Sequence, residues 1–412
     1  MKIDQEYIRV VGNNISPKDI IRAITDTGKQ DEAFYVMNVG EVIRKHELWL
    51  KTFPKIKPFY AVKCNDSKVV LRLLAALGTG FDCASKGEIS RVMSLGVPAE
   101  RIIYANPAKP SSHIKYAAKV GVNLLTFDNQ SELFKIKELH PKAKLVLRIR
   151  CDAKDSQCPL GMKFGADKSS IKALIQLALE LGLELAGVSF HVGSGCRDLA
   201  AFSEGVLAAC DALTEMVYCG ADPYILDIGG GFLESTIHKV SLSVNEALES
   251  VPHGISIIAE PGRYYVDSAY TLATAIHGIR GKEYYINDGV YGSFNCVLYD
   301  HANPLPIPLK ETHNDDLKNF KIWGPTCDSL DMVNDNVLLP ELEIGDWLVW
   351  ECMGAYTLPV CSTFNGFPVP NVFYIATEDV WKVVQDIITL ANPEDQFDPV
   401  NFNVTLLQTV SS

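Results

Sequence analysis

The feature that most restricts the fold of this 412-residue chain is a regular alternation between residues 59 and 260. Short runs rich in apolar and β-branched residues are separated by stretches with the apolar spacing of amphipathic helices. Glycines at positions 96, 121, 182 and 220 follow four of these stretches, as expected at helix C-termini. The strand-like runs are Phe59–Lys63, Gly80–Cys83, Ile102–Asn106, Leu124–Asp128, Leu145–Arg150, Ala186–Val192, Tyr224–Ile228 and Ser256–Glu260.

Strands that are joined through helices run parallel, because a helical crossover returns the chain to the same end of the sheet. Eight such strands are the number that closes a (β/α)8 barrel of the TIM type. An open, doubly wound parallel sheet has the same alternation and is the alternative at this stage. We therefore expect an α/β barrel over residues 39–269.

The sequence on either side of the alternation has a different character. After residue 270, strand-like runs are separated by turns that contain Pro and Gly, and one further run, Ala33–Met37, precedes the barrel. We expect a mostly β C-terminal domain that includes the N-terminal segment, so that residues 1–38 and 270–412 form one discontinuous domain. Its expected later strands are Glu283–Asn287, Asn295–Leu298, Trp347–Glu351 and Val372–Ile375.

Composition excludes several classes of protein. The 50 acidic residues outnumber the 38 basic ones, for a net charge of −12, which argues against nucleic acid as a partner. The 11 cysteines include no Cys-x-x-Cys pair, so neither a disulfide framework nor a zinc ribbon is expected, and no other metal site is indicated. No apolar leader and no run of about 18 apolar residues occurs. The sequence predicts a cytoplasmic protein that does not enter a membrane.

Polar residues of several kinds stand at the ends of the predicted strands. A single polar residue at such a position usually only begins a loop. In a parallel barrel, however, the carboxyl ends of all strands meet on one face, where barrel enzymes carry their active sites. We therefore interpret the whole set as a candidate site: Lys63, Asp82, Asn106, Asp128, Arg148, His191, the glycines at 229–231, and Glu260.

Three of these features fit a phosphorylated cofactor that carries a carbonyl group. Lys63 follows four apolar residues, which suits a Schiff-base lysine, although a surface lysine is the commoner outcome. The glycine-rich turns at 191–195 and 229–231 allow backbone N–H groups to approach a phosphate. Glu260 and Arg263 form either a local ion pair or a pair that binds the ring nitrogen and the phosphate of such a cofactor.

Seven segments, in order and at consistent spacing, closely resemble the eukaryotic ornithine decarboxylases, a branch of the alanine-racemase-like decarboxylases that use pyridoxal 5'-phosphate (PLP). The resemblance extends from about residue 33 to 367, and the segment around Cys327 is the most specific to this branch. The segments are Pro58–Asn65, Phe81–Ser85, Phe190–Gly195, Asp227–Phe232, Glu260–Tyr264, Trp323–Asp331 and Met353–Thr357.

The resemblance implies a carbon–carbon lyase that converts L-ornithine to putrescine and CO2, the first step of polyamine synthesis. Lys63 matches the lysine that holds PLP, Glu260 the residue that keeps the ring nitrogen protonated, and His191 the residue that stacks on the ring. The other positions that match cofactor-binding residues are Asp82, Arg148, Ser194, Gly230, Gly231, Gly262, Arg263 and Tyr356.

The same resemblance implies how the substrate is held. Cys327 matches the acid that reprotonates the α-carbon across a homodimer interface, so that each active site takes residues from both chains. Asp300 and Asp328 match the carboxylates that bind the distal ammonium of ornithine. Tyr291 and Phe364 match residues that line the substrate channel.

Three alternatives stay open. Lysine is one methylene longer than ornithine, which is worth only about 1–3 kcal/mol of discrimination, so a lysine/ornithine decarboxylase of mixed specificity is one of them. The second is an inactive decoy like the antizyme inhibitors, which lack parts of the cofactor set. The third, a lysine-dependent aldolase, leaves Glu260 and the phosphate-binding set unused.

Two features of the sequence differ from the animal enzymes that it resembles. The long C-terminal extension that promotes their degradation is missing, so we do not expect that mode of regulation. The segment at 109–139, where antizyme docks in them, is only partly basic, which leaves antizyme binding open.

Overall fold

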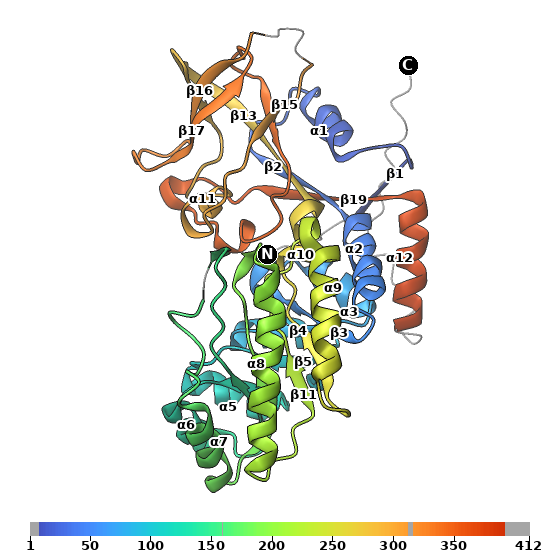
Figure 1. Cartoon of the computed structure of the whole chain (residues 1–412). Helices are drawn as coiled ribbons and strands as arrows, with labels where there is room; N and C mark the ends of the chain where they lie inside the picture. Colours follow the sequence, from blue (N-terminus) through green and yellow to red (C-terminus); the bar gives the residue numbers. More distant parts are fainter. Residues whose placement is uncertain (1–7, 159, 312–315, 392–412) are drawn as a thin grey trace. The chain divides into compact units, whose positions relative to one another are not determined.

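The computed structural model describes residues 8–158, 160–311 and 316–391, and for 388–391 the backbone alone. The chain forms two compact units, shown in Figure 1. The barrel unit comprises His46–Ser67 and Leu71–Tyr264, and the sheet unit comprises Met1–Lys45, Lys68–Val70 and Tyr265–Ser412. Residues 1–7 and 392–412 of the expected β domain lie outside the described residues.

The barrel unit is built on eight parallel strands that close on themselves. Its last strand, β12, pairs with its first, β3, in the register Ile257↔Ile56, so the open-sheet alternative is wrong. All eight predicted strands are confirmed, with bounds that differ by a few residues. The strands are β3 (Ile56–Ala61), β4 (Gly80–Cys83), β5 (Ile102–Tyr104), β6 (Leu124–Phe127), β7 (Lys144–Arg148), β9 (Glu184–Ser189), β11 (Ile225–Asp227) and β12 (Ser256–Ala259).

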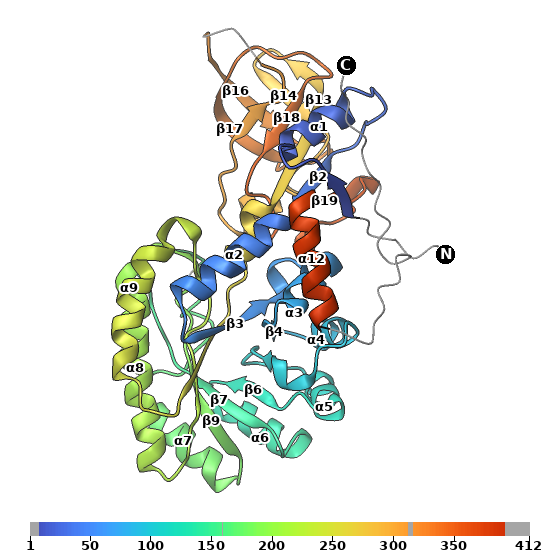
Figure 2. The ribbon, with the colours of Figure 1, turned by 90° about the vertical axis from the view of Figure 1, so that its right-hand side faces the viewer.

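Helices connect successive strands, and Figure 2 shows α5 to α9 arranged around the barrel strands. The glycines predicted to end helices at 96, 121, 182 and 220 all have positive φ, which glycine adopts without steric cost. The helices are α2 (Val39–Thr52), α3 (Lys68–Ala76), α4 (Lys86–Met93), α5 (Ser111–Val120), α6 (Gln130–Leu139), α7 (Ile171–Glu180), α8 (Leu199–Tyr218), α9 (Ile237–Ala247) and α10 (Arg263–Val266).

The interior of the barrel is packed with apolar side chains. Ile103, Val146, Ala186 and Ile258 are at most 3% exposed and belong to four different strands. Such a filled interior holds the strands in register and leaves the residues at their carboxyl ends to form a site. A short two-stranded antiparallel sheet of β8 (Ser156–Cys158) and β10 (Ser194–Cys196) also belongs to this unit.

In the sheet unit, the N-terminal strand β2 (Phe34–Asn38) lies inside the sheet. It pairs in parallel with β19 (Asn371–Thr377) and antiparallel with β13 (Tyr270–Arg280). The expectation that the N-terminal segment joins the C-terminal sheet is therefore confirmed. The remaining strands are β1 (Ile8–Val11), β14 (Glu283–Ile286), β15 (Pro306–Pro308), β16 (Lys318–Trp323), β17 (Met332–Leu339) and β18 (Trp347–Trp350), and the helices are α1 (Pro17–Thr25), α11 (Asn295–Tyr299) and α12 (Glu378–Ala391).

The strand expected at Asn295–Leu298 is wrong, because these residues form helix α11. The Asn295 side-chain amide donates hydrogen bonds to the carbonyls of Gly292 and Thr357, at 2.6 and 2.8 Å. These bonds anchor the start of helix α11. A short apolar run does not by itself distinguish a strand from a helix. Among the described residues, no helix is both long enough and apolar enough to cross a membrane.

Candidate active site

Lys63 and Asp82 meet at the carboxyl ends of two neighbouring barrel strands. Lys63 stands in a single 3₁₀ turn after β3, between the buried residues Val62 and Cys64. The register Ala61↔Asp82 brings β4 alongside, and the Lys63 ammonium is paired with the Asp82 carboxylate. The Asp82 side chain is fully buried, whereas that of Lys63 is 39% exposed. The unit therefore offers an accessible amine that is held by a buried carboxylate.

Two further buried carboxyl groups follow β11 and β12. Burial raises the pKa of Asp227 to about 6. Burial also raises the pKa of Glu260 well above its usual value, and the negative charges of Asp227 and Asp82 add to that shift, while the Lys63 ammonium opposes it. Glu260 and Asp227 share a side-chain hydrogen bond. The pair therefore retains a proton near neutral pH.

Arg148 and His191 complete the charged set. Arg148 ends β7 beneath Phe164, with its guanidinium carbon 5.1 Å from the ring centroid. Burial lowers the pKa of His191 well below 6.5, and the positive charges of Arg148 and Lys63 lower it further, so this imidazole is neutral. The Gly193 N–H donates to His191 Nδ1 at 2.9 Å, which places the ring proton on Nε2.

Two glycine-rich turns come together next to these groups. A Cβ on Gly230 would lie 2.7 Å from the Glu260 carbonyl oxygen and 2.9 Å from His191 Nε2, so only glycine allows this approach. The Arg263 guanidinium donates to Ser194 Oγ at 3.3 Å, which links strand β10 to the segment after β12. Backbone N–H groups, a hydroxyl and a guanidinium are the groups that bind a phosphate.

Within the described part of the barrel unit, three buried carboxylate oxygens lack a hydrogen-bond partner. They are Asp82 Oδ1, Asp227 Oδ2 and Glu260 Oε1. Leaving such oxygens unsatisfied is costly, so they indicate a site for a group that carries a proton or a positive charge.

The sheet unit carries the other predicted residues. The Tyr291 hydroxyl donates to the Asp328 carboxylate, and its ring stacks on Phe364 with centroids 4.4 Å apart. Cys327 is exposed and Asp300 is buried at the end of α11. Tyr356, predicted with the phosphate-binding set, belongs to this unit and has a φ of 56°.

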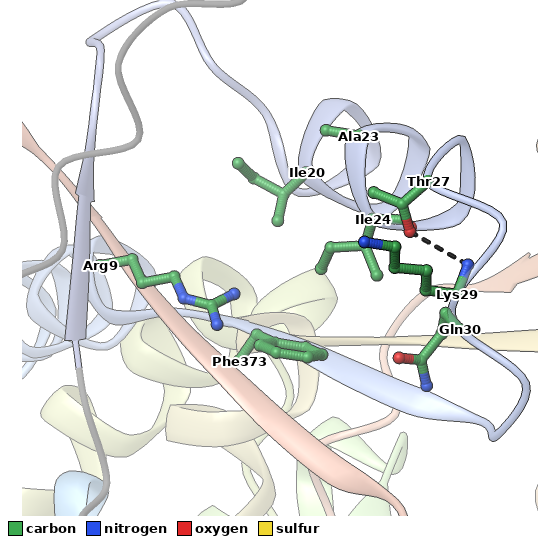
Figure 3. A pocket seen from close by; sticks show the side chains of 8 residues that line it. All are labelled: Arg9, Ile20, Ala23, Ile24, Thr27, Lys29, Gln30 and Phe373. Atoms are coloured by element: carbon green, nitrogen blue, oxygen red, sulfur yellow. Dashed lines mark hydrogen bonds between the residues drawn. The ribbon is translucent and has the colours of Figure 1, made fainter.

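A pocket of the sheet unit, shown in Figure 3, contains none of the predicted site residues. Arg9 of β1 lies over the ring of Phe373 from β19, at 4.4 Å from its centroid. The other lining residues come from α1 and the turn after it: Ile20, Ala23, Ile24, Thr27, Lys29 and Gln30.

Sequence reasoning missed one buried and one half-buried acid of the barrel site, Asp227 and Glu88. Asp227 is the last residue of strand β11, but the strand predicted from the sequence ends one residue later, at Ile228, so a strand-end position did not point to it. Glu88 lies in helix α4, its carboxylate accepts the Ala84 N–H at 2.6 Å, and burial raises its pKa. No strand-end position points to Glu88, because only the folded chain brings α4 close to Asp82 and Lys63.

Comparison with known proteins identifies the family. Residues 39–267 match the pyridoxal-binding domain of the pyridoxal-dependent decarboxylases. The chain belongs to the pyridoxal-dependent decarboxylases. It is 45% identical to the ornithine decarboxylase of Mus musculus, over 93% of this chain and 90% of that protein. It is also 46% identical to antizyme inhibitor 2 of Xenopus laevis, over 89% of this chain and 86% of that protein.

The arginine decarboxylase of Paramecium bursaria Chlorella virus is a solved structure of similar fold. Its TM-score is 0.84 at 37% identity, with 87% of this chain and 100% of that chain covered. The cofactor of this decarboxylase family is PLP, and the barrel unit fits it chemically. Lys63 offers an amine for the PLP carbonyl, the buried carboxyl groups suit a protonated ring nitrogen, and Ser194 and Arg263 suit a phosphate.

Proposed function

We propose that this pyridoxal-dependent decarboxylase converts L-ornithine to putrescine and CO2. The observation that carries the proposal is the Lys63–Asp82 pair beside the protonated Glu260–Asp227 pair, because a lysine amine and a buried acid are what a PLP decarboxylase needs. The relative from Mus musculus, which is similar over 93% of this chain, is an ornithine decarboxylase.

Each cofactor-binding residue has a task in this proposal. When bound, PLP withdraws the electron pair that stays on the α-carbon as CO2 leaves. Lys63 would hold PLP through its amine, and Asp82 would hold that amine in place. Glu260 keeps a proton at the ring nitrogen, and neutral His191 packs on the ring. Arg148 offsets the charge of the buried acids, and the phosphate is bound by Ser194, Gly230, Gly231, Gly262, Arg263 and Tyr356.

The substrate end of the site uses residues of the sheet unit. Asp300 and Asp328 bind the distal ammonium of ornithine, since two carboxylates compensate for its desolvation. The Tyr291 hydroxyl fixes one of these carboxylates, and its ring with that of Phe364 lines the channel for the methylene chain. The Cys327 thiol delivers a proton to the α-carbon.

We also propose that the enzyme is a homodimer in which Cys327 and Asp328 serve the partner's barrel. Large apolar side chains near this segment are exposed in the single chain, among them Leu330 at 66% and Tyr299 at 70%. Exposed apolar residues of this size commonly mark an interface. An isolated monomer is then inactive. We assign residues 39–269 to the cofactor-binding domain and residues 1–38 and 270–412 to the other domain.

We further propose a cytoplasmic location. None of the 11 cysteines, all of which lie in the described part of the chain, forms a disulfide, which suits a reducing compartment.

Overall similarity does not decide whether the chain decarboxylates ornithine, because two relatives with other names are also similar to it. The side chains of the site must decide instead. Antizyme inhibitor 2 of Xenopus laevis matches this chain as closely as the ornithine decarboxylases do, and the viral arginine decarboxylase aligns over its whole length with 87% of this chain. Arginine is therefore a further candidate substrate. The complete set around Lys63 favours an enzyme over a decoy. Asp300 and Asp328 suit any cationic side chain, so ornithine, lysine and arginine must be compared directly.

The test is a product assay on purified protein with PLP and each of the three amino acids. We expect the highest kcat/KM for ornithine, and a higher value for lysine or arginine would overturn the assignment. Lys63→Ala should lose both the visible absorption of the bound cofactor and all product. An absence of PLP absorption in the wild type would favour the decoy. Lys57→Ala, at an exposed position of β3, is the matched control and should leave both readouts unchanged.

A further inference from the structure

Cys327 lies in a loop of the sheet unit between β16 and β17, without regular backbone pairing of its own. Its backbone N–H donates a hydrogen bond to Oδ1 of Asn365 at 3.0 Å. Asn365 stands 38 positions later in the chain. No motif of the sequence singled out Asn365. We propose that Asn365 is a positioning residue that holds the Cys327 thiol in place for proton delivery; this inference rests on the proposed decarboxylation.

The backbone at Asn365 directs its side chain. Asn365 has φ 56° and ψ 12°, in the left-handed region, and Gly366 follows with φ 80°. Apart from glycine, asparagine and aspartate adopt this conformation most readily, because their short polar side chains bond locally. At position 365, the side-chain oxygen of asparagine or aspartate also accepts a hydrogen bond from the Cys327 N–H.

The neighbouring parts of the loop have other anchors. The Asp331 carboxylate accepts the N–H groups of Val290 and Thr326, each at 2.8 Å. The Asp328 carboxylate accepts the Tyr291 hydroxyl and the Leu330 N–H, the latter at 3.0 Å. Asn365 is therefore the side chain that holds the backbone of Cys327 itself, while Asp328 is held independently of it.

This division of tasks predicts how substitutions at Asn365 affect catalysis. Without the acceptor, the Cys327 backbone rotates and the thiol leaves its position, so the proton transfer slows. The carboxylate of Asp328 stays anchored, so substrate binding changes little. We expect Asn365→Ala to lower kcat for ornithine about tenfold, the equilibrium factor of one ordinary hydrogen bond, with KM within about twofold of the wild type.

Three substitutions separate positioning from backbone conformation. Asn365→Gly tolerates the left-handed backbone but has no acceptor, whereas Asn365→Asp tolerates it and retains one. Positioning predicts that the Asp variant keeps kcat within about threefold and that the Gly variant loses as much as the Ala variant. Wild-type kcat in the Gly variant would overturn the proposal, because backbone freedom alone would then suffice. If Asn365→Ala does not fold, the comparison of kcat between Asn365→Asp and Asn365→Gly still tests the proposal. Asn371→Ala, at an exposed position of β19, is the control.

Two readouts locate the effect. Hydrogen–deuterium exchange of the peptide that contains Cys327 should quicken about tenfold in the Gly variant and not in the Asp variant. Unchanged exchange would overturn the proposal, and this readout is independent of whether the wild type makes putrescine. In a Cys327→Ala background, Asn365→Gly should cost no further activity, because Asn365 acts through the thiol. An additional tenfold loss there would show that Asn365 acts elsewhere.

Discussion

Replacement of Asp227 by asparagine should make the cofactor-free protein more stable at neutral and alkaline pH. The Asp227 carboxyl is buried beside Glu260 and Asp82, and it accepts the Gly229 N–H at 2.9 Å. Asparagine has the same size and keeps this acceptor, and its amide can donate to an oxygen of the Glu260 carboxyl group. The substitution therefore removes a buried charge and leaves the local structure in place.

The size of the effect follows from the pKa of Asp227. Against an ordinary value of 3.8, a pKa of about 6 in the folded protein corresponds to about 3 kcal/mol. The folded state holds its proton more tightly than the unfolded state, so the free energy of unfolding falls as the pH rises from about 4 to about 6. It then stays low at higher pH. Asp227→Asn should therefore gain up to about 3 kcal/mol at pH 8 and almost nothing at pH 4.

The assay is urea unfolding of PLP-free protein, at one protomer concentration, for the wild type and the variant between about pH 4 and pH 8. The exposed Asp222→Asn substitution is the control and should follow the wild type at every pH. If Asp227→Asn and the wild type lose stability in parallel over this range, burial of the Asp227 charge does not set the pH dependence, and the reasoning is wrong.

Three further substitutions test other parts of the structure. Gly230→Ala places a Cβ 2.7 Å from a backbone oxygen, so urea unfolding should show a loss of about 1–3 kcal/mol, whereas Gly87→Ala, with no neighbour closer than 3.6 Å, should lose none. Cys327→Ala should keep PLP absorption but lose most putrescine, with by-products of oxidation in the product chromatogram; undiminished putrescine would remove Cys327 from the mechanism. Tyr291→Phe removes the hydroxyl that donates to Asp328, so KM for ornithine should rise up to about tenfold with kcat little changed, and an unchanged KM would contradict the role of this pair.

Much of the fold could be predicted because its elements are local. Each barrel strand is a short apolar run bounded by turn residues, and each strand end carries its polar residue at a readable position. Eight parallel strands close into a barrel, and the pairing of β12 with β3 confirms this closure. The error at Asn295–Leu298 has the same origin, because that run was judged by its local composition. The helix there is anchored by Thr357, 62 residues away in the chain.

The candidate site could be read from the sequence only in part. Lys63, Asp82 and Glu260 stand in motifs, and their chemistry pointed to PLP together with the family resemblance. Glu88 and Asn365 stand in no such motif, because each acts through a partner that is distant in sequence. Glu88 reaches the site from a helix, and Asn365 reaches Cys327 across 38 residues.

The sequence by itself determined the alternation of strands and helices, the polar residue at each strand end and the presence of a lysine suited to PLP, since these depend on residue type and spacing alone. Only the tertiary structure decided that β2 lies between β13 and β19, that Glu260 holds a proton beside Asp227, and that His191 is neutral. The physical reason is that strand order, desolvation and charge interactions depend on which groups are neighbours in space.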